Sequence, residues 1–249
     1  MDFVNVIKKH GYPIISKAVS HNMSIARRHP DGKVATKYFS DEMENSLFSL
    51  KKYKWLLDAP FRYGDQCCTV MKKNPSHRYA TWTGRKSFVG TMAQESKIRY
   101  SQWLKNGCNA FDIKNPSSSP LSFWTEQDIL QYIKKYDLKI ADVYGDVVYK
   151  DDDGMIYDNQ TFNESMKLVT TGEDRTGCVF CMFGIKKDTD RFLRLKKIEP
   201  KKYDYLMRGG CFDEDGMWVP GKDENGVFGL GYKFVIDWLN EHGGLNIKY

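Results

Sequence analysis

Four of the six cysteines are spaced so that they could hold one metal centre. Cys178 and Cys181 form a C-x-x-C pair inside the segment GEDRTGCVFCMFG, and Cys67 and Cys68 form an adjacent pair much earlier in the chain. Thiols three residues apart on a helical turn point the same way, so both can ligate one centre. A C-x-x-C pair alone is weak evidence, because redox dithiols and zinc sites share it. Two pairs together can complete a four-sulfur coordination sphere.

Three interpretations of these four thiols stay open. Zinc accepts four sulfurs, but its structural sites usually draw on two spaced pairs and not on adjacent cysteines. Neighbouring side chains on a helix diverge, so Cys67 and Cys68 suit a broad object better than a single ion. A 4Fe–4S cluster is such an object, and four thiolates are its usual ligands. The third interpretation is that these are ordinary reduced thiols with no metal.

The residues around the first pair favour an anionic centre. Asp65 precedes Cys67 and Cys68 and is a suitable N-cap, which predicts that both thiols lie near a helix N-terminus. The partial positive charge there favours thiolate. Lys72 and Lys73 follow about one turn later. We expect these two cations to lie beside the cofactor and offset its negative charge, although ordinary surface lysines would give the same pattern.

Length, composition and charge limit the class of protein. The chain has 249 residues, a 41% hydrophobic content and a formal net charge of +6. This composition is typical of a globular protein, no apolar run approaches membrane-spanning length, and no signal peptide is evident. Adjacent cysteines argue against a secreted disulfide scaffold, so a cytoplasmic protein is expected. Residues 1–39 and 186–202 are rich in Lys and Arg. Such patches attract nucleotides or nucleic acid, although a solvated basic face is enough to explain either patch alone, and no membrane partner is expected.

The hydrophobic pattern alternates between helices and strands, which predicts an α/β layered fold. Strands are expected near Ile14, over 87–92 and over 167–171, with a hairpin formed by 143–149 and 155–157. The expected helices are 3–9, 51–57, 95–104, 126–136, 188–198, 200–208 and 232–240.

Several motifs together resemble the phosphoadenosine phosphosulfate (PAPS) reductase family, in particular its phage and prophage branch. The two cysteine pairs with their following lysines are similar to the 4Fe–4S site of adenylyl-sulfate reductases. The matching segments are CCTVMKKNP (67–75), FVGTMAQESKIR (88–99), GCNAFD (107–112), PLSFWTEQDILQYI (120–133), VYGD (143–146) and TTGEDRTGCVFCMFG (170–184).

The resemblance implies a site and a fold. It implies that Cys67, Cys68, Cys178 and Cys181 ligate a cluster, with Arg175 beside the cofactor. It implies substrate or anion contacts at Gly90, Glu95, Ser96 and Arg99, although Met92 replaces an arginine that is usual in the family. The alternative for Arg99 is a salt bridge with Glu95 one turn back. The implied fold is α/β, with an adenine-nucleotide alpha-hydrolase-like (Rossmann-like) layered sheet and a helical C-terminal region.

Two family features are missing from this sequence: the SGGKDS-type phosphate loop and the tail with the catalytic cysteine. The pattern resembles an N-terminally truncated sheet, with a reductase-like domain over 1–185 and a helical extension over 186–249 packed on it. An unpaired strand edge would then recruit a second copy, as a homodimer, or a partner protein that covers the edge.

The functional expectation has two branches. In the first, the chain is an iron–sulfur enzyme of sulfonucleotide reduction or sulfur transfer, acting on an adenine sulfonucleotide or a nucleic acid. In the second, it is a non-catalytic, phage-encoded binding or regulatory derivative, or a fragment that needs an N-terminal partner. The catalytic residue is unassigned: Cys108 is expected to be a buried thiol, and acidic neighbours should blunt the nucleophilicity of Cys211.

Overall fold

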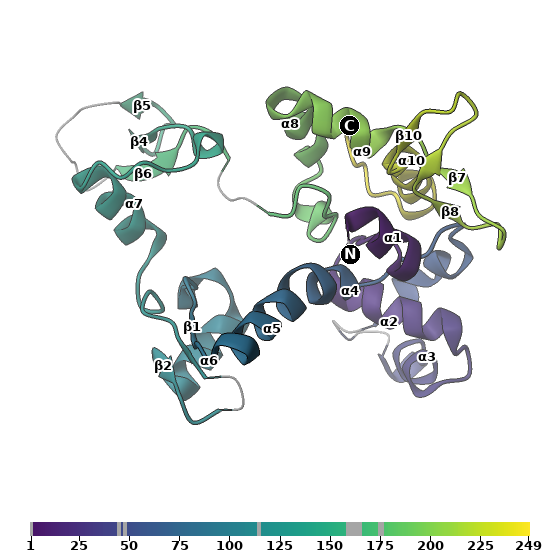
Figure 1. Ribbon diagram of the computed structural model, residues 1–249, viewed down its shortest axis with the longest axis horizontal. Helices are drawn as coiled ribbons and strands as arrows, with labels where there is room; N and C mark the ends of the chain where they lie inside the picture. Colours follow the sequence, from purple (N-terminus) through teal and green to yellow (C-terminus); the bar gives the residue numbers. More distant parts are fainter. Residues whose placement is uncertain (1, 44–45, 47–48, 114–115, 158–165, 174–176) are drawn as a thin grey trace. The chain divides into compact units, whose positions relative to one another are not determined.

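The described chain is a mixed α/β protein, as the sequence predicted. The computed structural model describes residues 2–43, 46, 49–113, 116–157, 166–173 and 177–249. Contacts group the chain into two compact units (Figure 1): unit 1 comprises Met1–Ser76 and Cys178–Tyr249, and unit 2 comprises His77–Gly177. These boundaries differ from the division at residue 185 that the sequence predicted, and that division stays a prediction.

Unit 1 consists mainly of helices with two short hairpins. Its regular elements are α1 (Phe3–His10), α2 (Lys17–Arg28), α3 (Lys33–Tyr38), η1 (Asp41–Met43), η2 (Lys51–Asp58), α4 (Gln66–Cys68), η3 (Thr69–Lys73), η6 (Ile185–Lys187), α8 (Arg191–Ile198), α9 (Pro200–Met207), β7 (Cys211–Phe212), β8 (Trp218–Val219), β9 (Gly221–Lys222), β10 (Phe228–Gly229) and α10 (Tyr232–Gly243). The helix α5 (Asn74–Thr83) begins in unit 1 and ends in unit 2.

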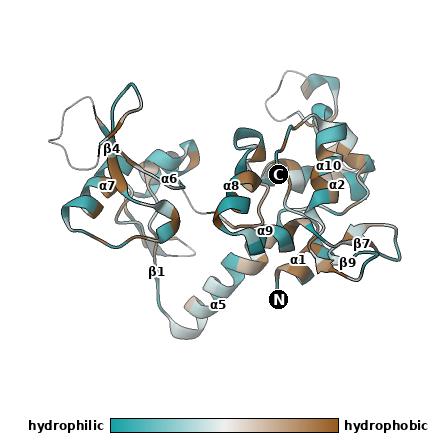
Figure 2. Cartoon of the chain, turned by 90° about the horizontal axis from the view of Figure 1, so that it is seen from above, coloured by the Kyte–Doolittle hydropathy of each residue, from teal (hydrophilic) through white to brown (hydrophobic). Residues whose placement is uncertain are grey.

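The main hydrophobic core belongs to unit 1 and joins the two ends of the chain. Helix α1 contributes Ile7, and α10 contributes Val235 and Leu239, all at most 1% exposed. Figure 2 shows α1 and α10 with marked hydrophobic segments. The rings of Tyr12 and Tyr232 meet edge to face, with centroids 5.3 Å apart. Among the described residues, no helix is long and apolar enough to cross a membrane.

The segment after α1 is irregular and buried, where the sequence predicted a strand near Ile14. Gly11 has φ +81° and approaches the backbone of Arg62 so closely that a Cβ would lie 2.3 Å from its carbonyl carbon. The approach lets Tyr12 form a single parallel bridge with Tyr63. Ile15 adopts φ +57°, which ends any extended run. The strand prediction was therefore wrong, because tertiary packing decides the conformation here.

The two hairpins of unit 1 have the same turn, and the first is also tied to the segment before the cysteines. In each turn one aspartate, Asp213 or Asp223, accepts two backbone N–H groups through Oδ1. Only for Asp213 does the described structure add an arginine: Arg62 Nη1 donates to Asp213 Oδ2 at 2.6 Å. Although burial opposes it, the hydrogen bonds from Met217 and Arg62 lower the pKa of Asp213. The charged form of Asp213 therefore stabilises the folded hairpin.

We expect the contribution of Asp213 to depend on pH. Because its pKa is lower in the folded state, its contribution is fully present above the unfolded pKa of about 3.9 and is lost as the pH falls through the folded value. Asp213→Asn should lower the free energy of unfolding by about 1 kcal/mol at pH 7 and by less near pH 3. Urea unfolding at both pH values measures this. The control is Asp223→Asn; equal, pH-independent losses in the two variants would contradict the argument.

Unit 2 has short strands and a small interior. Its elements are β1 (Ser87–Phe88), η4 (Ala93–Glu95), α6 (Lys97–Asn106), β2 (Asn109–Ala110), β3 (Ser117–Ser118), α7 (Glu126–Lys135), η5 (Asp142–Tyr144), β4 (Val147–Lys150), β5 (Ile156–Tyr157) and β6 (Lys167–Thr170). The sheets have the orders β1-β3-β2 and β5-β4-β6. The hairpin is confirmed for β4 and β5, and so is the strand at 167–170, whereas the start of the predicted first arm, at 143–144, belongs to η5.

The start of α7 also follows the prediction. Thr125 and Asp128 form a capping box, in which the Thr125 hydroxyl accepts from the Asp128 N–H and Asp128 accepts from the Thr125 N–H. By contrast, the buried strand predicted over 87–92 is only two residues long, and Phe88 is 83% exposed. That part of the prediction was wrong, because the described residues place no element over this side chain.

Candidate functional site

The four cysteines that were predicted to act together all belong to unit 1. Cys67 and Cys68 lie on the short helix α4, which continues into the π-helical turn η3. Such π-turns within helices are frequent at functional sites. Cys178 and Cys181 lie on the loop before η6, and the N–H of Cys181 donates to the carbonyl of Cys178 at 3.0 Å. The fold therefore brings two distant segments of the chain into the same unit.

The thiols are close enough to influence one another electrostatically. Burial, with the nearby thiols of Cys68 and Cys181, raises the pKa of Cys67 to about 12. Burial also raises the pKa of Cys181; the Phe183 N–H and Arg191 oppose this effect, while Cys178 and Cys68 add to it. Thiols of the two pairs are thus near enough to affect one another's pKa, and a single site for all four stays a prediction.

Burial affects the pKa of Cys67 more strongly than the helix N-terminus does. The sequence predicted that a helix capped by Asp65 would favour the thiolate, but Asp65 makes no side-chain capping bond, although α4 continues through η3 into α5. The Asp65 carboxylate instead contacts His21 Nδ1 at 3.2 Å. Desolvation disfavours the charged form, and it is the largest cause of the raised pKa of Cys67. A metal centre at this site must therefore displace a proton from Cys67.

The donor set fits an iron–sulfur cluster by its chemistry. It consists of four thiols, of which Cys67 is buried, Cys68 and Cys181 are partly buried and Cys178 is exposed. Within the described ranges, no three His, Cys, Asp or Glu side chains are grouped so as to hold a single metal ion. A four-iron cube is wider than one ion, so its thiolate ligands stand further apart than those of zinc.

The basic residues predicted beside the cofactor have different outcomes. Lys72 and Lys73 lie on η3, directly after the helix with Cys67 and Cys68, and both side chains are exposed. Arg175 lies outside the described residues. Both lysine side chains are therefore accessible to an anion in solution.

The predicted anion-binding residues lie in unit 2 and are engaged with one another. Ser96 Oγ accepts from the N–H of Arg99 at 3.2 Å and so caps α6. Glu95 accepts from the Met92 N–H at 2.9 Å and forms a salt bridge with Arg99, the alternative that the sequence offered. Gly90 has open space around its backbone. The anion-binding role of these residues stays a prediction.

Neither remaining cysteine joins the four. Cys108 lies in unit 2, and Cys211 lies on β7 with its sulfur close to the backbone of Gly221. Both are partly buried. They therefore serve as controls for experiments on the four-cysteine site.

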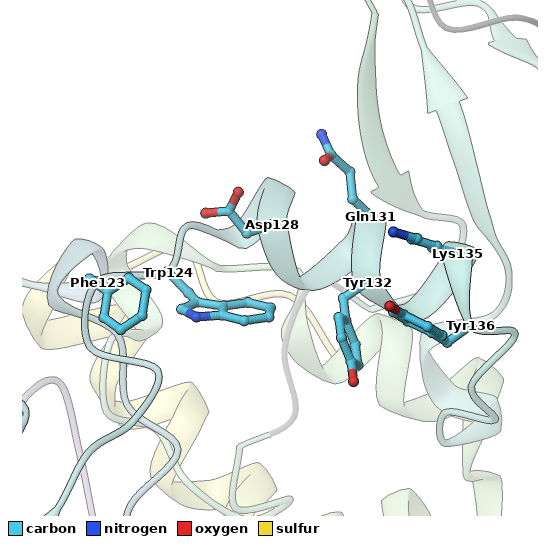
Figure 3. A pocket seen from close by; sticks show the side chains of 7 residues that line it. All are labelled: Phe123, Trp124, Asp128, Gln131, Tyr132, Lys135 and Tyr136. Carbon is cyan, nitrogen blue, oxygen red and sulfur yellow. The ribbon is translucent and has the colours of Figure 1, made fainter.

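Unit 2 carries a shallow pocket on α7 that none of the predicted site residues lines (Figure 3). Its volume is about 410 Å³. The rings of Tyr132 and Tyr136 lie side by side with centroids 4.6 Å apart, and Trp124 meets Tyr132 edge to face. The other lining residues are Phe123, Asp128, Gln131 and Lys135. The pocket is aromatic and open and holds no cluster of catalytic groups.

A comparison with protein-family models tests the family resemblance that the sequence motifs suggested. The family model described as phosphoadenosine phosphosulfate reductase domain matches residues 33–182, more than half of the chain. The chain belongs to this family. A search of the curated proteins finds no match, and a search of the solved structures finds none either.

The segment matched by the PAPS reductase family model contains all four cysteines of the site. It also contains Glu95, Ser96 and Arg99, so both predicted sites lie in family sequence. The elements that follow it, from η6 to α10, lie outside the match, although they belong to unit 1 with the cysteines. The phage branch and a truncated sheet stay predictions.

Proposed function

We propose that the chain is an iron–sulfur member of the PAPS reductase family, in which Cys67, Cys68, Cys178 and Cys181 bind a 4Fe–4S cluster. The observation that carries this proposal is the gathering of two distant cysteine pairs in unit 1, where each pair shifts the thiol pKa of the other. The adjacent pair on α4 favours a cluster over zinc, because two neighbouring side chains diverge.

The substrate class that fits this proposal is an adenine sulfonucleotide. The family match supports sulfonucleotide chemistry in general. A bound 4Fe–4S cluster would supply one-electron redox chemistry or a polarising charge beside the sulfur group. Lys72 and Lys73 are exposed cations next to the cysteine helix, suited to attract a phosphate or sulfate. Nucleic acid, as an acceptor of sulfur, carries phosphates that the same two lysines would attract.

Calorimetry tests the sulfonucleotide proposal. We expect cluster-loaded protein to bind PAPS or adenylyl-sulfate more tightly than ATP, with affinity that falls as salt rises. The double variant Lys72→Gln/Lys73→Gln should weaken binding by about tenfold. The control is Lys52→Gln/Lys54→Gln, which removes the same charge from lysines that lie over Tyr53 and Phe39. Cluster-loaded protein that binds no sulfonucleotide would contradict this proposal and favour a non-catalytic derivative.

We also propose that the chain associates with a second copy. Unit 2 exposes large apolar side chains, including Trp82 at 84% and Phe88 at 83% exposed. Exposed apolar surface of this kind marks interaction sites, and a two-fold dimer covers the same patch on both copies. Light scattering coupled to size exclusion should give a mass above that of one chain at micromolar concentration. A mass of 28.9 kDa at every concentration would contradict it.

A further inference from the structure

The loop with Cys178 and Cys181 is held by residues that come later in the chain than the family match. The match ends at residue 182, whereas the loop contacts Arg191 on α8 and Tyr232 on α10. From the other side, the N–H groups of Met182 and Gly184 donate to the carbonyls of Pro13 and Ile15, at 3.0 and 2.8 Å. The loop is therefore fixed on two sides.

Arg191 holds the backbone on both sides of Met182. Its Nη1 donates to the carbonyl of Cys181 at 2.6 Å and to that of Phe183 at 3.2 Å. Its Nε donates to Asp188 Oδ2 at 3.2 Å, which fixes the plane of the guanidinium. The N–H of Phe183 in turn donates to Cys181 Sγ at 3.4 Å. Arg191 thus holds the carbonyls on either side of the Met182–Phe183 peptide, whose N–H donates to the Cys181 sulfur.

Tyr232 fixes Phe180, which directly precedes Cys181. Its hydroxyl donates to the carbonyl of Phe180 at 2.5 Å, and the side chain is fully buried. Cys178, Cys181 and Cys67 are all near enough to contribute, after burial and Tyr12, to the raised pKa of Tyr232. The hydroxyl therefore stays protonated and remains a donor. A partly buried carbonyl left without this donor would lose a hydrogen bond, so the bond favours one conformation of the loop.

We propose that Arg191 and Tyr232 are positioning residues for the cluster site: they fix the Cys178–Gly184 loop, and Arg191 also sets the charge beside Cys181. The proposed effect of Arg191 on the cluster rests on the proposed function, whereas the fixing of the loop does not. Hydrogen bonds to ligand sulfurs and nearby positive charge both raise the reduction potential of an iron–sulfur cluster. Arg191 supplies the charge directly and the hydrogen bond through the Phe183 peptide. The C-terminal elements are in this way part of the site and not an appendage.

The fixing of the loop can be tested without a cluster. In reduced, metal-free, full-length protein, Arg191→Gln should speed amide hydrogen exchange of Phe183 and Gly184 by about tenfold or more, because charge-assisted hydrogen bonds are lost. The control is Arg194→Gln, which removes a cation that binds the same Asp188 at 2.9 Å from the next turn of α8. Equal exchange in the two variants would overturn the positioning role of Arg191.

Tyr232 has its own matched control. Tyr232→Phe should speed exchange of the Cys181 amide, which follows the released carbonyl. Tyr12→Phe removes a hydroxyl that is equally buried but donates to the Leu230 carbonyl at 2.8 Å. It should leave the Cys181 amide at the wild-type rate. Identical exchange of this amide in both variants would remove Tyr232 from the proposal.

The midpoint potential of the cluster-loaded protein tests the proposed electrostatic effect of Arg191. Arg191→Gln should shift the potential lower than wild type, Arg191→Lys should restore part of the shift, and Arg194→Gln should leave it unchanged. An unchanged potential in loaded Arg191→Gln overturns this part while the cluster assignment stands. Wild-type protein that takes up no iron overturns the proposed function itself, and with it the electrostatic part.

Discussion

A Cys181→Ser variant purified without oxygen should retain less than about a tenth of the iron and sulfide of the wild type. Serine keeps the shape of the side chain but replaces a thiolate with a poor ligand for iron. Among the four proposed ligands, Cys181 has its sulfur and its carbonyl held by the Phe183 N–H and by Arg191. Iron and sulfide per chain are measured chemically.

The matched control is Cys211→Ser. Cys211 belongs to the same unit but lies on β7, beside Gly221. It should retain the wild-type iron content. If Cys181→Ser and Cys211→Ser lose iron equally, the loss reports general destabilisation and the assignment of Cys181 as a ligand is contradicted.

A Gly11→Ala variant should lose about 3 kcal/mol of the free energy of unfolding, because two costs combine. The residue has φ +81°, and its Cβ would lie 2.3 Å from the backbone of Arg62 and Tyr63. The backbone cannot yield without moving the Tyr12–Tyr63 bridge. That bridge joins the end of α1 to the segment that leads into Cys67. Urea unfolding of the wild type and the variant gives the difference.

The Gly216→Ala variant separates the cost of a positive φ from the cost of the steric clash. Gly216 has φ +70° in the turn of the first hairpin, and a Cβ added there would meet no atom within 4 Å. It should therefore lose only the conformational part, about 1 kcal/mol. Similar losses for Gly11→Ala and Gly216→Ala would show that the close approach at Arg62 does not limit stability.

The sequence predicts well where the signal is local. The cap at Thr125 and Asp128, the hairpin around Asp151–Gly154 and the helix from Tyr232 all follow from neighbouring residues. The cysteine spacing likewise pointed to one site, and the fold places all four in one unit. In these cases the residues that specify the structure lie within a few positions of one another or share a chemistry that is rare elsewhere in the chain.

Long-range packing accounts for what the sequence did not predict. A strand was predicted near Ile14, but the carbonyls of Pro13 and Ile15 accept hydrogen bonds from the cysteine loop instead. Nothing in the basic run 188–198 distinguishes Arg191 from Arg194, because only the tertiary fold directs one guanidinium to the loop. Tyr232 was predicted only as the first residue of the last helix. The donor role of its hydroxyl depends on a carbonyl that lies far away in the sequence.

The metal content of the wild-type protein tests the central proposal most directly. Full-length protein purified without oxygen should be brown and contain about four irons and four acid-labile sulfides per chain, with absorption from thiolate-to-iron charge transfer. Zinc should be well below one equivalent. Colourless protein with one zinc per chain and no sulfide would contradict the cluster and assign the four cysteines to a structural zinc site.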